Sequence, residues 1–319
     1  PQLILTCPDY VCRNYHELVE TESYPPCYRI IPTLSMFTIH SWMSALQLER
    51  FEQKASQLSE RLKRCNSNWE DAFFITLARN FGFGLNGDAF ETWANRIPLR
   101  AVDKHRDELF QIEAFFFGQA GLLQGTAGDE YYLRLKKEYE YLSHKFGLTP
   151  MDVSQWRFLR LRPTNFPHIR IAQLAVLYHR SYGLLSRIME AETVTKVHEI
   201  LKGGTSAYWV NHYTFEHPSP SRPKTLSNSS LDLLIINTVA TFLYSYGVHK
   251  GKEEYCARAG AFLEELKAEY NYITRMWEQC GIKAANASDS QALIQLKKEY
   301  CDKKKCLYCR IGYEYLKRN

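Results

Sequence analysis

Hydrophobic residues recur with helical spacing along almost the whole chain after residue 33. Between Leu34 and Cys65, apolar residues such as Leu58 and Leu62 stand three or four positions apart with charged residues between them. This spacing predicts one long amphipathic helix, or two shorter ones. The same periodicity predicts helices over residues 67–82, 88–95, 103–123, 129–146, 169–189, 193–201, 231–246, 252–279, 288–300 and 306–316. Strands are hard to find there, so we predict an all-α, irregular multi-helical fold with short loops.

The start of the chain and one proline-rich passage break this pattern. The opening residues PQLILT resemble a strand, and we expect an extended segment over residues 1–33 followed by a multi-helical domain over residues 34–319. Three prolines and several serines interrupt residues 217–230, because proline cannot continue a helix and serine favours turns. This passage is interpreted as a long surface loop or as a boundary between two parts of the domain.

Composition narrows the class of protein. The 319 residues are 45% hydrophobic and 24% charged, which excludes a disordered or low-complexity chain. Residues 231–246 form the most apolar stretch, but polar residues interrupt it, so we expect no membrane span. Nine cysteines, an odd number in a chain too large to need disulfides, indicate reduced thiols and a cytoplasmic location. The first residue is Pro1, which suggests a piece of a longer polypeptide.

The strongest chemical signal is a segment rich in arginine. Residues 153–189 contain six arginines and no Asp, Glu or Lys. Guanidinium donates hydrogen bonds in a fork that fits phosphate or carboxylate oxygens, so this bias points to anion recognition. Pro163 and Pro167 predict an extended loop, and the next helix is expected to begin near Ile169. We select Arg157, Arg160, Arg162 and Arg170 as candidate residues for binding nucleic acid or another anion.

One alternative stays open for these arginines, and another for the aromatic residues beside them. They could instead pair with carboxylates of neighbouring helices, for example Glu138 or Glu190. The aromatic residues of the segment, Trp156, Phe158 and Phe166, could stack on bases, although packing in the core is the simpler interpretation.

Three cysteines crowd the basic C-terminal segment. Cys301, Cys306 and Cys309 have spacings that occur in both zinc and iron–sulfur sites. A fourth ligand could come from Cys280, from a histidine, or from one of Cys7, Cys12 and Cys27. Residues 297–319 carry eight Lys or Arg and three acidic residues, and such cations lower thiol pKa values. Zinc, an iron–sulfur cluster, free structural thiols and a redox role all remain possible interpretations.

Catalytic motifs are absent from the sequence. There is no GxxxxGK[ST], HExxH, GxSxG or EF-hand pattern, so catalysis can be assigned to no residue. Glu113 is flanked by apolar residues in the sequence, and we expect its carboxyl group to be buried and hydrogen-bonded. His212 and His217 are five residues apart, which is a poor spacing for two metal ligands on one helix, and we expect them to pack structurally.

Four strings in this order carry a resemblance to a known family. They are IEAFFFGQAGLL (112–123), WRFLRLRPTNFPHIRIAQLA (156–175), SAYWVNHYTF (206–215) and SQALIQLKKEYCDKKKCLYCRIG (290–312). Together they resemble DUF2851, a bacterial family of unknown function. The resemblance implies that this chain is the helical C-terminal part, lacking an N-terminal region of the family that is similar to restriction-type nucleases. It implies no catalytic residue within this chain.

These observations lead to one expected function and two alternatives. We expect a helical binding or accessory module that contacts nucleic acid or another phosphate-bearing anion through the arginine-rich loop. One alternative is a nuclease-like enzyme whose catalytic region lies N-terminal to this chain. The other is a scaffold for protein partners with no ligand of its own.

Overall fold

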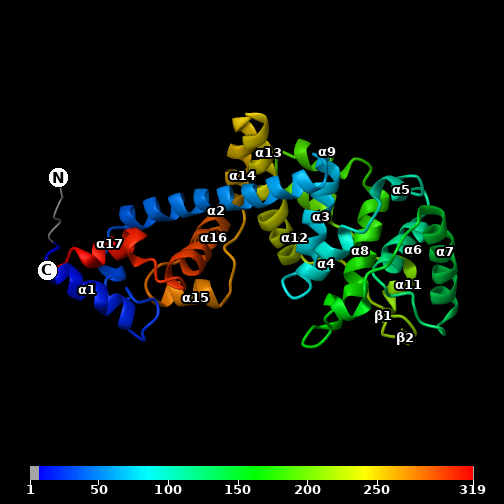
Figure 1. The fold of residues 1–319 in the computed structure, drawn as a ribbon, viewed down its shortest axis with the longest axis horizontal. Coiled ribbons are helices and arrows are strands. Elements are labelled where there is room, and N and C mark those ends of the chain that lie inside the picture. Colours follow the sequence, from blue (N-terminus) through cyan, green and yellow to red (C-terminus); the bar gives the residue numbers. More distant parts are fainter. Residues whose placement is uncertain (1–6, 319) are drawn as a thin grey trace, which may run out of the picture. The chain divides into compact units, whose positions relative to one another are not determined.

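The computed structural model describes residues 7–318, which are predominantly helical, and the all-α prediction is confirmed (Figure 1). The α-helices are α1 (Asp9–Glu20), α2 (Met36–Arg64), α3 (Trp69–Phe81), α4 (Gly87–Ala94), α5 (Leu99–Asp103), α6 (Leu109–Gln119), α7 (Glu130–Phe146), α8 (Pro167–Arg180), α9 (Leu184–Glu190), α10 (Val194–Leu201), α11 (Ala207–Val210), α12 (Asn228–Leu234), α13 (Ala240–Lys250), α14 (Glu253–Glu265), α15 (Tyr272–Gln279), α16 (Ala287–Gln295) and α17 (Arg310–Leu316).

Short segments of other structure complete the description. Tighter 3-10 turns are found at Ile31–Thr33, Val153–Gln155, Pro163–Asn165 and Cys306–Tyr308, and wider π-helical turns at Ile235–Val239 and Leu296–Cys301. The strands β1 (His212–Thr214) and β2 (His217–Pro218) pair antiparallel.

The chain divides into two compact units. The first joins the chain up to Gln57 with the chain from Tyr244 onward, and the second holds Leu58–Leu243. The expected single domain from residue 34, with a subdivision near residues 217–230, therefore differs from the observed division. The proline-rich passage lies within the second unit, where hydrogen bonds fix it: Gln173 Nε2 donates to the Lys224 carbonyl, and Lys224 Nζ donates to the Val210 carbonyl.

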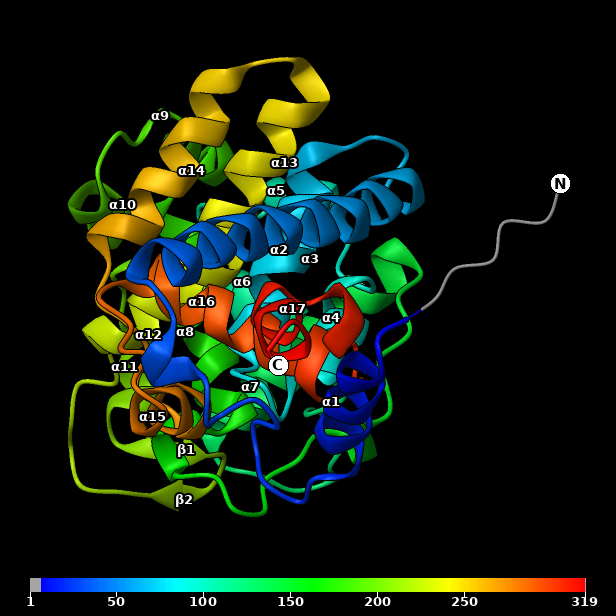
Figure 2. The ribbon, with the colours of Figure 1, turned by 90° about the vertical axis from the view of Figure 1, so that its left-hand side faces the viewer.

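The first unit has a core built from both ends of the chain. Helix α1 packs against α17, while α14 and α15 pack against α16 (Figures 1 and 2). The buried side chains include Leu18, Trp42, Trp277 and Leu293. Asn14 Nδ2 donates to the Tyr315 and Leu316 carbonyls at the end of α17. These contacts satisfy carbonyl groups that a helix terminus leaves without partners.

The expectation of an extended segment over residues 1–33 is wrong where α1 forms. This helix is amphipathic, with Leu18 buried and Val11 and Tyr15 packed against the core of the first unit. Tertiary burial of one face stabilises this short helix, which would be marginal in isolation. The strand-like residues 1–6 lie outside the described part of the chain.

The second unit is organised around α6. This helix packs against α7 and α8, and every residue from Ile112 to Gln119 is buried. Helices α3 and α4 pack on each other, and α10 packs against α9 and α12. Aromatic rings fill the interior, with Trp93 meeting Phe116 edge to face at 5.1 Å between ring centroids. A helix buried on all sides has no polar face, which explains the apolar run FFF at residues 115–117.

Several predicted helices are observed as single helices, and others are observed as two shorter helices separated by a break. Residues 36–64 form one helix, which decides between the one and two helices that the periodicity allowed. The predicted helix over 169–189 is two helices, because Gly183 takes a left-handed φ of +61° before α9. Residues 252–279 also divide, since Asn271 forms a capping box with Thr274 and starts α15.

One continuous helical stretch, Asn228–Lys250, is long and apolar enough to cross a membrane by length and composition. However, 67% of its most apolar window is buried inside the protein. Helices that form the core of a folded protein meet the same criterion, so this stretch is weak evidence for a membrane span.

Candidate functional site: the arginine loop and a separate polar cavity

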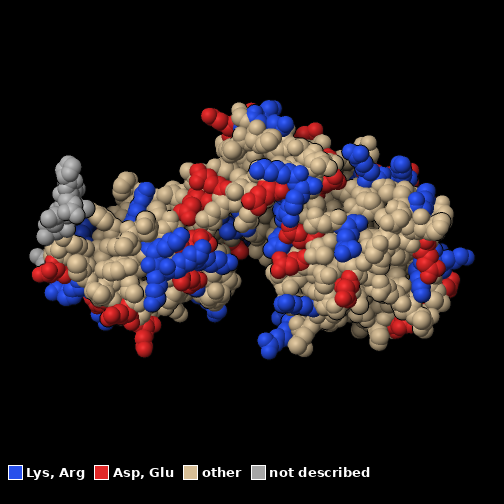
Figure 3. Space-filling view, in the orientation of Figure 1, with Lys and Arg blue, Asp and Glu red and all other residues tan. Residues whose placement is uncertain are grey.

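Arg157, Arg160 and Arg162 all lie on the loop that leads into α8, and all three are exposed. We call residues 157–162 the arginine loop. No acidic side chain in residues 7–318 forms an ion pair with any of the three. Figure 3 shows basic side chains projecting from this loop. The structure thus brings together three of the four arginines that the sequence singled out, and their charges are not neutralised by internal carboxylates.

Arg170, the fourth candidate, is buried in the first turn of α8 and is only 6% exposed. Its guanidinium donates to Asn165 Oδ1 at 2.6 Å and to Gln173 Oε1 at 2.9 Å, and it stacks over the Phe83 ring at 4.4 Å. Burial lowers its pKa to about 10, because a low-dielectric environment disfavours the charged form. Arg170 therefore holds the loop in place and cannot reach an external ligand.

The base of the arginine loop is tied to the core of the second unit. The Asn86 side chain bridges the backbone of Arg157: its Oδ1 accepts from the Arg157 N–H at 2.8 Å, and its Nδ2 donates to the Arg157 carbonyl at 2.9 Å. Trp156 is buried, and its indole N–H donates to the Ala120 carbonyl at 2.8 Å. Asn165 closes the other end through Arg170. A loop fixed at both ends presents its tip with little loss of conformational entropy on binding.

The aromatic residues of this segment serve mainly as packing. Phe158 and Phe166 are half-buried and meet edge to face at 5.3 Å, and Phe158 also contacts the His168 ring. The core interpretation of Trp156 is consistent with its burial. The exposed apolar side chain of the loop is Leu159, which is 82% exposed. Arg160 beside it has a left-handed φ of +65°, a conformation that non-glycine residues adopt rarely.

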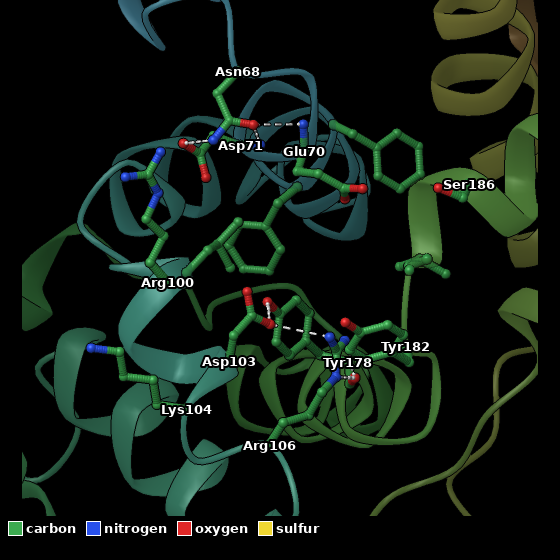
Figure 4. A pocket seen from close by; sticks show the side chains of 15 residues that line it. Asn68, Glu70, Asp71, Arg100, Asp103, Lys104, Arg106, Tyr178, Tyr182 and Ser186 are labelled. Atoms are coloured by element: carbon green, nitrogen blue, oxygen red, sulfur yellow. Dashed lines mark hydrogen bonds and ion pairs between the residues drawn. The ribbon is translucent and has the colours of Figure 1, made fainter.

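A separate polar cavity of about 590 Å³ lies elsewhere on the second unit (Figure 4). Glu70 and Asp71, at the start of α3, line it from one side. Asp103 and Arg106 line it from the other side, together with Tyr178 of α8. Arg100, Lys104 and Tyr182 also contribute to the wall. None of the four arginines predicted from the sequence lines this cavity.

The cations and carboxylates of the cavity are balanced, and many of them are already paired. Arg106 donates to the Tyr178 carbonyl from both Nε and Nη2, at 3.1 and 2.6 Å, and to Asp103 Oδ1 at 3.1 Å. The Tyr178 hydroxyl donates to the same Asp103 oxygen at 2.6 Å. Burial, and then the negative charge of Asp103, raises the pKa of Glu70. The lining includes no histidine or cysteine, and its ionisable groups are carboxylates, lysine, arginines and tyrosines.

Sequence reasoning missed this cavity because its lining comes from three separate stretches near residues 70, 103 and 180. None of these stretches carries a recognised motif, and each polar residue taken alone looks like an ordinary surface position. The i, i+3 spacing of Asp103 and Arg106 was the single available signal, and such pairs are common on helices.

The cysteines of the C-terminal segment lie together in the first unit. Cys309 is buried, while Cys301 and Cys306 are half-buried. Cys27 joins them, whereas Cys7 and Cys12 are exposed. As the side chains stand, no group of three or more His, Cys, Asp or Glu in residues 7–318 is arranged to hold a metal ion. The surrounding lysines are partly paired, for example Lys297 with Asp302 at 2.7 Å.

Glu113 is buried, as the sequence suggested, and its partners are hydroxyl groups. Tyr131 donates to Glu113 Oε2 at 2.6 Å, and Ser206 donates to Oε1 at 2.8 Å. Burial raises the pKa of Glu113 to about 6, although the two hydrogen bonds oppose this shift. Of the two histidines, His212 stacks on Tyr208 at 4.0 Å between ring centroids, whereas His217 is exposed.

Glu113 makes stability depend on pH in a defined direction. Its folded-state pKa of about 6 exceeds the ordinary value of 4.5. The protonated carboxyl therefore stabilises the fold fully below the ordinary value, and this contribution is lost as pH rises through about 6. We expect Glu113→Gln to remove this component, worth roughly 2 kcal/mol between pH 4.5 and 7.5. Denaturant unfolding of both proteins across this range measures it; identical pH slopes would contradict the assignment.

Comparison with known proteins gives one match. A family model described as "Protein of unknown function (DUF2851)" matches residues 1–272. The match begins at residue 1, so it does not support the expectation that an N-terminal region of the family is missing here. No curated protein and no solved structure matches the chain.

Proposed function

The chain belongs to the DUF2851 family, whose description assigns no function, and from its geometry we propose that it binds nucleic acid through the arginine loop. The observation that carries this proposal is the exposure of Arg157, Arg160 and Arg162 without any internal carboxylate partner. Guanidinium groups that are free of internal pairs remain available to phosphate oxygens, with which they form charge-assisted hydrogen bonds.

One acidic group lies near Arg157, and its charge does not weaken this argument. Arg157 and Asp88 line the same surface depression. However, Asp88 pairs with Arg79 at 2.7 Å, so its charge is already partnered. The guanidinium groups of the arginine loop therefore form no ion pair with a carboxylate among the described residues.

Leu159 lies beside these arginines and is 82% exposed, so the loop offers an apolar contact that a simple small anion could not use. Nucleic-acid-binding proteins use such side chains as wedges between base steps while arginines hold the flanking phosphates. The anchored base of the loop, through Asn86 and Trp156, gives this wedge a fixed position.

Salt-dependent binding tests the proposal. Fluorescence anisotropy with labelled duplex and single-stranded oligonucleotides would be measured over a series of salt concentrations. For duplex DNA each phosphate contact contributes about 0.9 to the slope of log K against log salt. We expect Arg160→Ala combined with Arg162→Ala to reduce this slope by about 2 and to weaken binding at every sequence tested.

A matched control removes the same charge elsewhere. Arg64 and Arg187 are exposed arginines of the second unit, and the double variant Arg64→Ala/Arg187→Ala should leave the slope unchanged. A wild-type Kd weaker than about 10⁻⁴ M at physiological salt overturns the proposal, as does an equal effect of both double variants. Binding to anionic lipid vesicles without binding to oligonucleotides would replace nucleic acid with a membrane surface. A cytoplasmic location remains a prediction, which fractionation of cells expressing the chain would check.

A further inference from the structure

Four cysteines line one small cavity in the first unit. Cys27, Cys301, Cys306 and Cys309 line a space of about 20 Å³, together with Pro26, Tyr300, Lys305 and Gly312. A space of this size is comparable to that of a single water molecule. The remaining cysteine of this neighbourhood, Cys280, does not line it. The fold thus brings one cysteine from near the start of the chain to the three that are clustered near its end.

Local backbone structure presents the three C-terminal thiols toward this space. Cys301 ends the π-helical turn Leu296–Cys301, and such turns are often found at functional sites. Cys306 begins a 3-10 turn, and Cys309 precedes the first turn of α17. A Cβ at Gly312 would overlap the Cys306 carbonyl, so glycine is required for this close approach.

Trp42 lies in the same core cluster as Cys309 and is only 8% exposed. Its indole Nε1 is buried without a hydrogen-bond partner among the described residues.

We propose that Cys27, Cys301, Cys306 and Cys309 together bind one zinc ion. Four thiolates are a common ligand set of structural zinc sites, which are tetrahedral with zinc–sulfur distances of about 2.3 Å. The size of the cavity favours a single ion over an iron–sulfur cluster. Because the side chains as they stand do not form a coordination sphere, the thiols must turn toward a common centre when the ion binds.

The zinc site would join segments that are remote in sequence. Cys27 lies between α1 and α2, and the other three ligands flank the last helices of the chain. Zinc would therefore fix the N-terminal segment against α17 in the first unit, where Asn14 already bonds the end of that helix. This role is structural and is independent of the arginine loop, which lies in the second unit.

Metal analysis of the full chain, purified after expression with added zinc, tests the proposal. We expect about one zinc per chain in the wild type. We expect Cys27→Ser and Cys309→Ser to lose it, while Cys27→His should retain it, since three cysteines and one histidine also form structural zinc sites. Cys256→Ser is the matched control, because Cys256 is half-buried in the same unit and does not line the cavity.

Cobalt(II) titration of the wild type keeps the test valid if a variant fails to fold. Cobalt bound by four thiolates gives intense sulfur-to-metal charge-transfer absorption, which should weaken in Cys27→His. A wild type that holds less than about a tenth of an equivalent of zinc and shows no such band overturns the proposal. Loss of zinc in Cys280→Ser but not in Cys27→Ser would overturn the assignment of the fourth ligand.

Discussion

Trp93→Ala is expected to lower the free energy of unfolding by about 3–5 kcal/mol, the typical range for removing a buried aromatic ring. Trp93 has no exposed surface, and its indole N–H donates to the Phe116 carbonyl at 2.9 Å. Its ring meets Phe90 and Phe116 edge to face at 5.7 and 5.1 Å. The substitution creates a cavity where three helices meet, and the surrounding rings cannot collapse into it fully. Guanidinium chloride denaturation measures the change.

One further variant separates packing from the hydrogen bond, and a second serves as a control at an exposed ring. Trp93→Phe keeps most of the ring volume and loses the indole donor, so we expect a smaller loss than for alanine. Tyr141→Ala removes a ring that is 56% exposed, and its effect should stay within about 0.5 kcal/mol. A loss below about 1 kcal/mol for Trp93→Ala would show that this site relaxes, against the expectation for a densely packed core.

Gly118→Ala is the second substitution for which we expect a large loss. A Cβ at this position would overlap the ring of Tyr139, which comes from α7 and is only 8% exposed. The Tyr139 hydroxyl is hydrogen-bonded to Gln119 at 3.0 Å, so the ring cannot move aside without breaking this bond. Overpacking of this kind costs about 1–3 kcal/mol and occasionally more. The cost exceeds the gain of up to about 1 kcal/mol that alanine brings to a helix interior.

Gly260→Ala is the matched control for this prediction. Gly260 also lies inside a helix, α14, but nothing lies within 4 Å of a Cβ added there. This variant should be stabilised by about 0.4–1 kcal/mol. Combining Gly118→Ala with Tyr139→Leu should recover part of the loss, because the double change relieves the overlap. Equal effects of the two glycine substitutions on thermal unfolding would refute the close contact between α6 and α7.

Periodicity predicted the helical class but could not locate several breaks. The long helix α2 was visible because apolar residues recur every three or four positions over its whole length. The break at Gly183 was hidden, since apolar residues continue on both sides of it. The boundary between the two units was equally hidden. It falls inside the continuous helices α2 and α13, where local sequence gives no signal of a change of partner.

For the candidate sites too, the sequence predicted the kind of residue present but not its place in the fold. The absence of acidic residues from 153–189 correctly marked a cationic segment, yet it could not separate Arg170, which is buried and bonded to amides, from the exposed Arg160 and Arg162. The polar cavity at Glu70, Asp103 and Tyr178 left no pattern at all, because its walls meet only after α3, α5 and α8 have packed.

The sequence by itself determined the helical class, a run of arginines without acidic neighbours, and three cysteines at metal-ligand spacing. These properties depend on residues a few positions apart, which remain neighbours whatever the rest of the chain does. Only the tertiary structure decided which arginines stay free of partners and that Cys27 joins Cys301, Cys306 and Cys309. Such choices depend on contacts between residues far apart in sequence, and burial and packing of whole helices establish those contacts.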